Sequence, residues 1–367
     1  MNVLILTEYL PRSEDAEITG GVEAYCHYVP AHLRREHDVT VIGRSTDGSV
    51  WDAAHVGSLP GRLWFLARAL VRGLKSPGDV VVGTTYVVQP IAWLIAKVRR
   101  RPIVFWYPDV LIGRWRGGEF GRVGGLIGET VERILLKLPI DRYIAISEST
   151  ASKLVANGVD PERVVVIPCG YEQHVVDAVE PQPYAVPTLV VVGRLVNYKR
   201  VDLVVSAVAD LVSRSAPVRL VIVGQGPEYE PLKELAAREA IADHVDFLGH
   251  VRRHVDVLSA VAGATVFASA SEIEGFGIAL VEAMALGVPY VVTDIPAFRE
   301  VTAGGVGGRL FPPGDVAGLV AALEPLLDSE AERSRARQAG VVHAERYRWD
   351  AVAARTAEVL GELLETS

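Results

Sequence analysis

Two glutamates that bracket a glycine turn, Glu274 and Glu282, are the first residues of this chain whose spacing suggests chemistry. The turn follows the apolar run 264–268, typical of a buried strand, and precedes a segment that we expect to be helical from Gly277 to Leu286. Residues eight apart on one helix would be about 12 Å apart along its axis. That separation does not suit two carboxylates that share a water in glycoside hydrolysis. It suits groups that hold different ends of an extended ligand, with a solvated surface pair as the alternative.

A cationic pair, Arg194 and Lys199, follows the apolar run 189–192. Arginine offers a planar fork of donors and lysine a point charge, so the two together would neutralise a diphosphate. The peptide N–H groups of Gly277 and Ile278, at the start of the expected helix, would add donors for the same anion. We interpret these residues as a site that stabilises charge on a departing diphosphate. Ordinary surface ion pairs are the alternative.

The sequence contains no familiar metal-binding motif. No two aspartates are separated by a single residue, so a D-x-D motif is missing, and the nine histidines form no H-E-x-x-H motif. We therefore expect no metal ion in the site, with protein cations in its place.

The first half of the chain carries two further candidates. Gly20 and Gly21 end a loop before an amphipathic segment and would place peptide N–H groups at a helix start, although an ordinary turn explains them equally. No G-x-G-x-x-G motif follows the first apolar run, which argues against NAD binding. Asp109 comes just after the apolar run 102–106, at the edge of a parallel sheet where ligands bind. A helix or turn cap is the alternative for Asp109.

Strand-like and helix-like segments alternate in two successive series, on either side of a proline-containing linker at 177–187. This pattern predicts an α/β protein with two Rossmann-like, doubly wound domains and an interdomain cleft. We expect the domains to span 1–176 and 185–349. The stretch 113–128 is rich in glycine and arginine, and we expect it to be a loop.

Charge is distributed unevenly. The net charge is −8, yet residues 50–142 contain 14 basic against 7 acidic residues, a net of +7. Such a region suggests an anionic partner. The chain has no RNA-binding aromatic signature and no helix-turn-helix pattern, so a membrane surface is favoured over nucleic acid. The basic amphipathic segment 61–75 would suit such a surface, and a solvated basic face is the alternative.

Localisation follows from what the sequence lacks. No run of about 18 apolar residues is present, and the apolar start of the chain is too short for a secretion signal. Cys26 and Cys169 fit buried small side chains in a reducing compartment. We expect a cytoplasmic protein, either free or peripheral on the inner face of the plasma membrane.

Taken together, these motifs resemble those of the retaining GT-B glycosyltransferases of the family 4 type, also called glycosyl transferases group 1. The resemblance covers nearly the whole chain and is strong over 188–315. It implies a GT-B fold, with two Rossmann-like domains and a cleft between them. The motifs that carry it are the E-x7-E stretch from Glu274 through Glu282 to Pro289, Gly193-Arg194-Leu195 with Lys199, Gly224-Gln225-Gly226-Pro227, Phe247-Leu248-Gly249-His250-Val251 and Gly20-Gly21-Val22-Glu23.

The resemblance also assigns roles to residues. It implies a UDP- or GDP-linked sugar donor held mainly by the second domain, with no separate cofactor. Arg194 and Lys199 would bind the diphosphate, Glu282 the ribose hydroxyls and Glu274 the donor sugar. A hexose-type sugar would be transferred with retention of configuration, and a donor phosphate oxygen would take the acceptor proton. Further donor contacts are implied for Gly20, Gly21, Val251 (through its backbone), Phe276, Gly277 and Ile278, and residues 350–367 would cross back to the first domain.

One departure from the family pattern affects the acceptor side. Members often carry a histidine immediately before the aspartate, and here Pro108 precedes Asp109. Asp109 would take over the acceptor contact, or that role lies elsewhere. The acceptor would be a glycan, a lipid-linked molecule or a small molecule. A GT-B sugar-nucleotide epimerase and a non-catalytic sugar-nucleotide-binding subunit remain as alternative functions.

Overall fold

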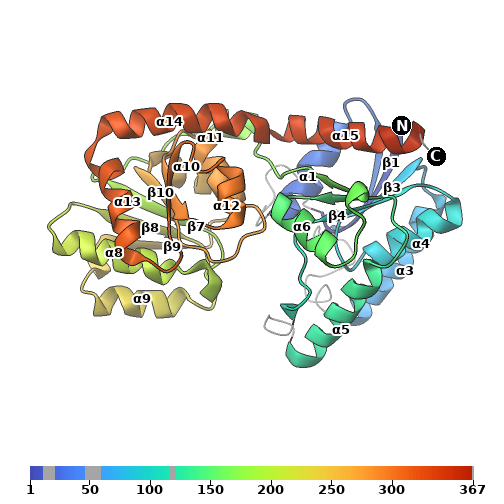
Figure 1. The fold of residues 1–367 in the computed structure, drawn as a ribbon, viewed down its shortest axis with the longest axis horizontal. Helices are drawn as coiled ribbons and strands as arrows, with labels where there is room; N and C mark the ends of the chain where they lie inside the picture. The colour runs from blue at the N-terminus through green and yellow to red at the C-terminus, as the bar shows by residue number, and fades with distance from the viewer. Residues whose placement is uncertain (11–20, 46–58, 116–120, 366–367) are drawn as a thin grey trace. The chain divides into compact units, whose positions relative to one another are not determined.

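The chain packs as two compact units, each built on its own parallel sheet (Figure 1). The computed structural model describes residues 1–10, 21–45, 59–115 and 121–365. Unit 1 is Met1–Cys169 with Trp349–Ser367, and unit 2 is Gly170–Arg348. Two six-stranded sheets flanked by helices confirm the predicted class, an α/β protein with two Rossmann-like domains. The functional domain limits that we expected, 1–176 with 350–367 and 185–349, stay a prediction.

The sheet of unit 1 has the strand order β2-β1-β3-β4-β5-β6. Its strands pair in parallel, and β3 and β4 are buried along their whole length because helices cover both faces. The winding direction reverses between β1 and β3, since β2 lies on one side of β1 and β3 on the other. The strands are β1 (Asn2–Leu10), β2 (Asp38–Ser45), β3 (Val80–Gly83), β4 (Ile103–Tyr107), β5 (Arg142–Ala145) and β6 (Val164–Val166).

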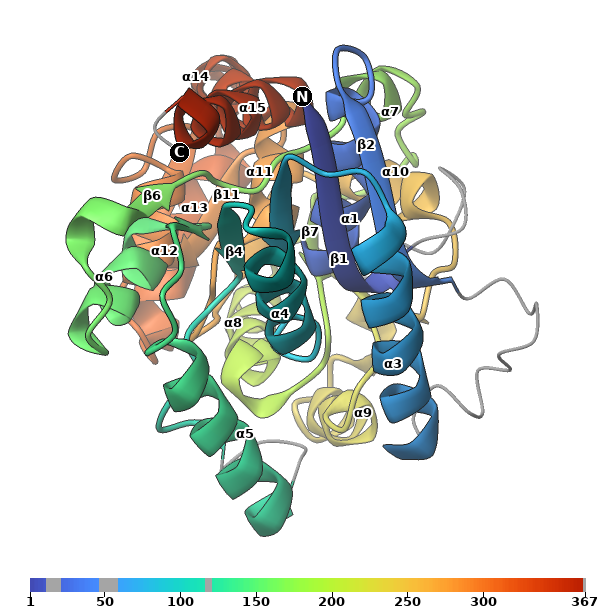
Figure 2. The ribbon, with the colours of Figure 1, turned by 90° about the vertical axis from the view of Figure 1, so that its right-hand side faces the viewer.

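Helices cover both faces of this sheet (Figure 2). α1 (Gly21–Leu33) packs with α15 (Trp349–Glu365) on one face (Figure 1). α3 (Leu59–Lys75), α4 (Gln89–Arg99) and α5 (Gly121–Leu135) lie on the other, with α4 between α3 and α5 (Figure 2). α6 (Glu148–Ala156) is capped by Ser147, whose hydroxyl accepts the N–H of Thr150 at 3.1 Å.

An aromatic cluster fastens α15 to the rest of unit 1. Trp349, the first residue of α15, is 1% exposed. Its indole stacks on Tyr28 with ring centroids 5.8 Å apart and meets the edge of Tyr25 at 6.3 Å. Tyr25 in turn stacks on Trp106 of β4 at 4.2 Å. The cluster thus joins three elements that are far apart in the sequence.

The sheet of unit 2 has the order β12-β11-β10-β7-β8-β9. Its winding reverses between β7 and β10, because β8 and β9 extend to one side of β7, and β10, β11 and β12 extend to the other. The strands are β7 (Thr188–Val192), β8 (Arg219–Val223), β9 (Val245–Gly249), β10 (Val266–Ser269), β11 (Tyr290–Thr293) and β12 (Gly308–Phe311).

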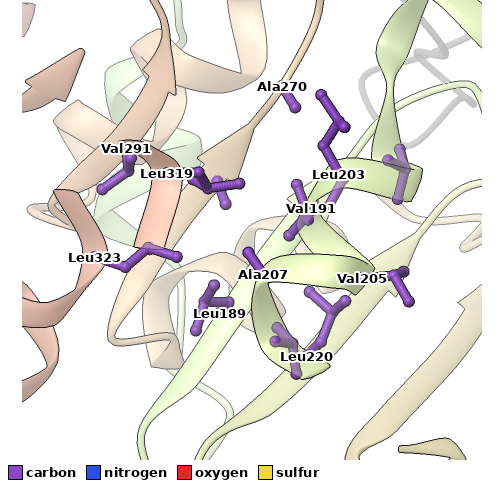
Figure 3. Packing of buried hydrophobic residues seen from close by; sticks show 14 of the residues in the cluster. Leu189, Val191, Leu203, Val205, Ala207, Leu220, Ala270, Val291, Leu319 and Leu323 are labelled. Carbon is purple, nitrogen blue, oxygen red and sulfur yellow. The ribbon is translucent and has the colours of Figure 1, made fainter. Parts of the chain in front are cut away.

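A large apolar core lies between this sheet and two of its helices, α8 (Val201–Ser213) and α13 (Val316–Asp328). Figure 3 shows Leu189 and Leu220 from the strands meeting Ala207 of α8. Leu319 and Leu323 of α13 close the core near Val291. The remaining helices of unit 2 are α7 (Gln173–Asp177), α9 (Tyr229–Arg238), α10 (His254–Gly263), α11 (Ile278–Ala285), α12 (Pro296–Val301) and α14 (Glu330–Ala344).

Two expectations about the elements need correction. The stretch 113–128 is not a loop throughout, because α5 already begins at Gly121. One of its glycines serves packing: a Cβ on Gly128 would lie 2.4 Å from the indole of Trp115, so a larger residue there would displace that ring. In addition, α12 and β12 were not expected, since both are short and glycine-rich sequence separates them.

We expect the aromatic cluster to dominate the stability of unit 1. Trp349→Ala should lower the free energy of unfolding by about 3–5 kcal/mol, because it removes a fully buried indole. Trp64→Ala is the matched control; Trp64 is 44% exposed on α3, and its loss should change stability by about 0.5 kcal/mol or less. Denaturant unfolding followed by circular dichroism measures both, and equal midpoints for the two variants would contradict the expectation.

Candidate functional site

The carboxyl edge of the unit 2 sheet gathers most of the expected residues. All six strands are parallel, so their carboxyl ends lie at one edge. In open sheets of this kind, ligands bind outside that edge, where the winding reverses. Here the reversal lies between β7 and β10. The loop after β7 carries Arg194 and Lys199, and the loop after β10 carries Glu274.

An ion pair joins these two loops. The Lys199 ammonium lies 2.5 Å from Oε1 of Glu274, and both side chains are mostly buried, at 22% and 14% exposed. Arg194 lies on the same loop, where its guanidinium donates to the Tyr198 hydroxyl at 3.0 Å. The structure therefore brings together the cation expected at a diphosphate and the carboxylate expected at a sugar.

Close backbone contacts position the Arg194 segment. Gly224, in the loop after β8, has φ +149°, and a Cβ there would lie 1.9 Å from the carbonyl oxygen of Gly193. The amide of Leu195 donates to the carbonyl of Gln225 at 2.9 Å. A side chain at Gly224 would push the β7 and β8 loops apart, so glycine is required for this approach.

Glycine also determines how α11 begins. Gly277 has φ +100°, in the left-handed region, and a Cβ on it would lie 2.7 Å from the ring of Phe298. α11 starts at the next residue, Ile278, so the first amides of the helix lie directly after Glu274 and the glycine turn. Phe276 is 5% exposed and packs edge-to-face on Tyr347, with centroids 5.5 Å apart. This buried contact therefore anchors the turn to Tyr347.

The second glutamate of the pair has a partner that sequence reasoning missed. Glu282 lies inside α11 and is only 8% exposed. Its Oε1 is 2.7 Å from Nε2 of His254, the first residue of α10. The Glu282 carboxylate raises the pKa of His254, and this effect exceeds the opposing effect of burial. The only signal for His254 in the sequence is its place five residues after the strand that ends at Gly249.

Val251 is half-buried on the same connection, between β9 and α10. The expected backbone contact with a base would come from this segment, and that role stays a prediction. Among the residues that the structure describes, no group of three or more His, Cys, Asp or Glu side chains is arranged to hold a metal ion.

The other expected residues lie in unit 1. Gly21 is the first residue of α1, and Gly20 lies outside the described residues. Asp109 follows β4, as expected, and its carboxylate contacts Lys153 of α6 at 2.5 Å and Arg114 at 3.4 Å. One oxygen also accepts the amide of Val110 at 2.8 Å. Asp109 is therefore an ion-paired carboxylate at the edge of the first sheet.

A second carboxyl group near Asp109 was not expected. Glu132 of α5 is fully buried; it accepts the indole N–H of Trp115 at 2.6 Å and the amide of Leu111 at 3.1 Å. Burial raises the pKa of Glu132. Its contacts fix the segment that follows Asp109. Sequence reasoning had no signal for it, because a single glutamate on an amphipathic helix usually faces solvent.

A doubly wound sheet with cations, carboxylates and a helix start at its reversal point defines a class of α/β proteins that bind phosphate-bearing ligands. Family models identify the class further. Glycosyltransferase Family 4 matches residues 19–174, and Glycosyl transferases group 1 matches residues 177–342. The two models follow one another along almost the whole described chain. The chain belongs to the family 4 type of GT-B glycosyltransferases.

Curated relatives match part of the chain. It is similar to a phosphatidyl-myo-inositol mannosyltransferase of Mycobacterium leprae, 41% identical over 143 residues, which cover 39% of this chain and 37% of the relative. A D-inositol 3-phosphate glycosyltransferase of Gordonia bronchialis is 32% identical over 57% of this chain and 50% of its own length. The chain spans about two fifths of the length of the mannosyltransferases that it matches.

Solved structures share the fold at low sequence identity. Sucrose-phosphate synthase from Thermosynechococcus elongatus superimposes with a TM-score of 0.81 at 18% identity and covers all of both chains. Anabaena HepE, solved in complex with UDP-glucose, has a TM-score of 0.77 at 18% identity over 99% of this chain and 100% of its own.

The His254–Glu282 contact predicts a pH-dependent contribution to stability. The pKa of His254 is raised in the folded state, so the contribution is fully present below the unfolded value of about 6.5. It is lost as pH rises through the folded pKa. The stability difference between the protein and His254→Asn should therefore shrink between pH 5.5 and pH 9, as measured by urea unfolding.

His343 supplies a control of opposite sign. Burial lowers the pKa of His343, so its contribution should grow as pH rises from 5.5. The stability difference for His343→Gln should therefore widen over the interval in which that for His254→Asn shrinks. Parallel changes in the two variants would count against the ion pair.

Proposed function

We propose that this chain is a retaining, metal-independent glycosyltransferase. It would move a hexose-type sugar from a UDP- or GDP-linked donor to a glycan, lipid-linked or small-molecule acceptor. The observation that carries the proposal is the pairing of Lys199 with Glu274 at the reversal point of the second sheet. In a sugar nucleotide the terminal phosphate and the sugar are adjacent, so their ligands need to be adjacent as well.

The proposed chemistry uses these groups at one bond. The bond between the anomeric carbon and the terminal phosphate oxygen breaks, and negative charge collects on the departing diphosphate. Lys199, Arg194 and the first amides of α11 would stabilise that charge where it develops. The acceptor oxygen would attack from the same face of the sugar and form the new bond. Its proton would pass to a phosphate oxygen of the leaving nucleoside diphosphate.

Binding of the donor would be divided between the two glutamates. Glu282 would accept from the ribose hydroxyls, with one of its oxygens already held by His254. Glu274 would accept from hydroxyls of the sugar while it keeps Lys199 in place. Asp109 would serve the acceptor and would be oriented by Lys153.

The relatives guide the choice of substrates to test. HepE was solved with UDP-glucose, and the relatives from Mycobacterium leprae and Mycolicibacterium smegmatis are named phosphatidyl-myo-inositol mannosyltransferases. We therefore propose a first panel of UDP-glucose, UDP-N-acetylglucosamine and GDP-mannose. Inositol, inositol phosphate and phosphatidylinositol would be offered as acceptors.

Labelled donors with and without each acceptor test the function. Acceptor-dependent release of nucleoside diphosphate with a labelled product supports transfer. Interconversion of the free sugar nucleotide would indicate an epimerase. Tight donor binding without turnover would indicate a binding subunit.

Two variants localise the chemistry within that assay. Lys199→Ala should lower turnover by on the order of 10²-fold or more, because the ammonium that stabilises negative charge on the departing diphosphate is lost. Glu282→Ala should weaken donor binding by on the order of tenfold. Lys233→Ala, an exposed lysine on α9, is the matched control and should behave as the parent protein. Near-normal turnover in Lys199→Ala would reject the diphosphate assignment.

We further propose that unit 1 lies on an anionic membrane surface. Among the described residues, ten of the fifteen large hydrophobic side chains that are exposed belong to α3, α4 and α5. α3 and α4 contain no acidic residue and carry exposed arginines and lysines. The described helices include none long and apolar enough to cross a membrane. The ten side chains are Leu63, Trp64, Val71, Leu74, Leu94, Val98, Leu126, Ile127, Val131 and Ile134.

An apolar face interleaved with basic groups suits acidic lipid headgroups. We expect the protein to sediment with phosphatidylglycerol vesicles, less so as salt rises, and not with pure phosphatidylcholine. Ile127→Glu with Ile134→Glu should reduce this binding by on the order of tenfold, since two exposed apolar groups of α5 are lost. Val342→Glu, on exposed α14 of unit 2, is the control. Failure to bind at any salt concentration would reject the proposal.

A further inference from the structure

Arg200 has a backbone conformation that its side chain does not favour. It lies between the short 3-10 turn Asn197–Lys199 and α8, with φ 48° and ψ 42°. This is the left-handed region, which glycine adopts readily and residues with a Cβ adopt rarely. Such a conformation persists where surrounding contacts hold it.

The guanidinium of Arg200 makes two kinds of contact. One is local: Nε and Nη2 donate to the carboxylate of Asp202, at 3.1 and 3.0 Å, in the first turn of α8. The other crosses to the loop after β10, where Nη1 donates to Oε1 of Glu272 at 2.5 Å. Each contact joins opposite charges, so each is a charge-assisted hydrogen bond.

The contact with Glu272 adjoins the Lys199–Glu274 ion pair. Glu272 precedes Glu274 by two residues, and Arg200 directly follows Lys199. The amide of Glu272 also donates to the carbonyl of Tyr198 at 2.9 Å. Three contacts thus join the same two short segments, and one of them is the lysine–glutamate pair itself.

We propose that Arg200 is a positioning residue for the diphosphate site, an inference that rests on the proposed function. Through Glu272 it holds the β7 and β10 loops together, so that Lys199 and Glu274 meet the terminal phosphate and the sugar at a fixed separation. Its contact with Asp202 stabilises the first turn of α8 and does not reach the β10 loop. The cross-loop contact, not the helix contact, is what donor recognition depends on.

Arg200→Gly tests this assignment because glycine accepts the left-handed backbone. The folded protein should keep its melting temperature, while the guanidinium is lost. The readout is the terminal-phosphate increment, the ratio of affinities for a nucleoside diphosphate and its monophosphate, measured by titration calorimetry with UDP, UMP, GDP and GMP. In Arg200→Gly this ratio should fall by about tenfold, the value of one charge-assisted hydrogen bond, with monophosphate binding unchanged.

Two further variants separate the contacts. Glu272→Gln breaks the cross-loop pair and should reproduce the loss of the increment. Asp202→Asn breaks only the helix pair and should keep the increment within about twofold to threefold. Arg200→Lys, which can reach one carboxylate, should restore part of the increment.

The possible results separate a failure of the positioning role of Arg200 from a failure of the proposed glycosyltransferase function. Binding of a nucleoside diphosphate by the parent protein with an unchanged increment in Arg200→Gly and Glu272→Gln overturns the positioning role alone. Equal losses in Glu272→Gln and Asp202→Asn also overturn it, since a general structural role would give that result. No binding of either diphosphate by the parent protein overturns the proposed function and this inference together.

Discussion

The ion pair between Lys199 and Glu274 is the interaction on which the proposed donor site of the second unit depends. Its partners come from loops on either side of the point where the sheet reverses its winding, so a parallel, doubly wound sheet is needed to bring them together. The left-handed glycine at 277 then starts a helix immediately beyond the pair. Gly224, after β8, lets the supporting loops touch without a side chain between them. These backbone features therefore position the two loops that carry the pair and the helix that follows it.

Local pairing also explains how an acidic unit would receive an anionic ligand. Unit 2, Gly170–Arg348, contains 16 basic and 23 acidic residues, a net of −7, which by itself would repel a diphosphate. At the sheet edge, however, each of the two glutamates contacts a basic side chain: Glu274 contacts Lys199, and Glu282 contacts His254. Arg194 lies beside them. The edge is close to neutral or positive over a few ångströms, and interactions at that range outweigh the distant charge.

Features that depend on hydrophobic periodicity and on the order of strands could be predicted from the sequence. Features that depend on contacts between residues far apart in the chain could not. Apolar runs identified most strands of both sheets, and their parallel arrangement placed Arg194, Lys199 and Glu274 at one edge. The prediction that 113–128 is a loop was wrong from Gly121 onward. Glycine disfavours helices locally, but Trp115 needs a glycine at 128 to pack against. His254 and Glu132 were missed because their partners, Glu282 and Trp115, are close only in the folded chain. The roles carried over from the family stay predictions.

The aromatic cluster around Trp349 has a consequence for the order in which this protein can be completed during synthesis. Unit 1 is discontinuous: its sheet is encoded before residue 170, but the indole that fills the space beside Tyr25 and Tyr28 is encoded at position 349. All of unit 2 leaves the ribosome in between. At a translation rate of about 5–20 residues per second, the nascent first unit waits on the order of ten seconds or more with that apolar surface uncovered. A chaperone that shields aromatic surface would have its longest opportunity to act on this protein during that interval.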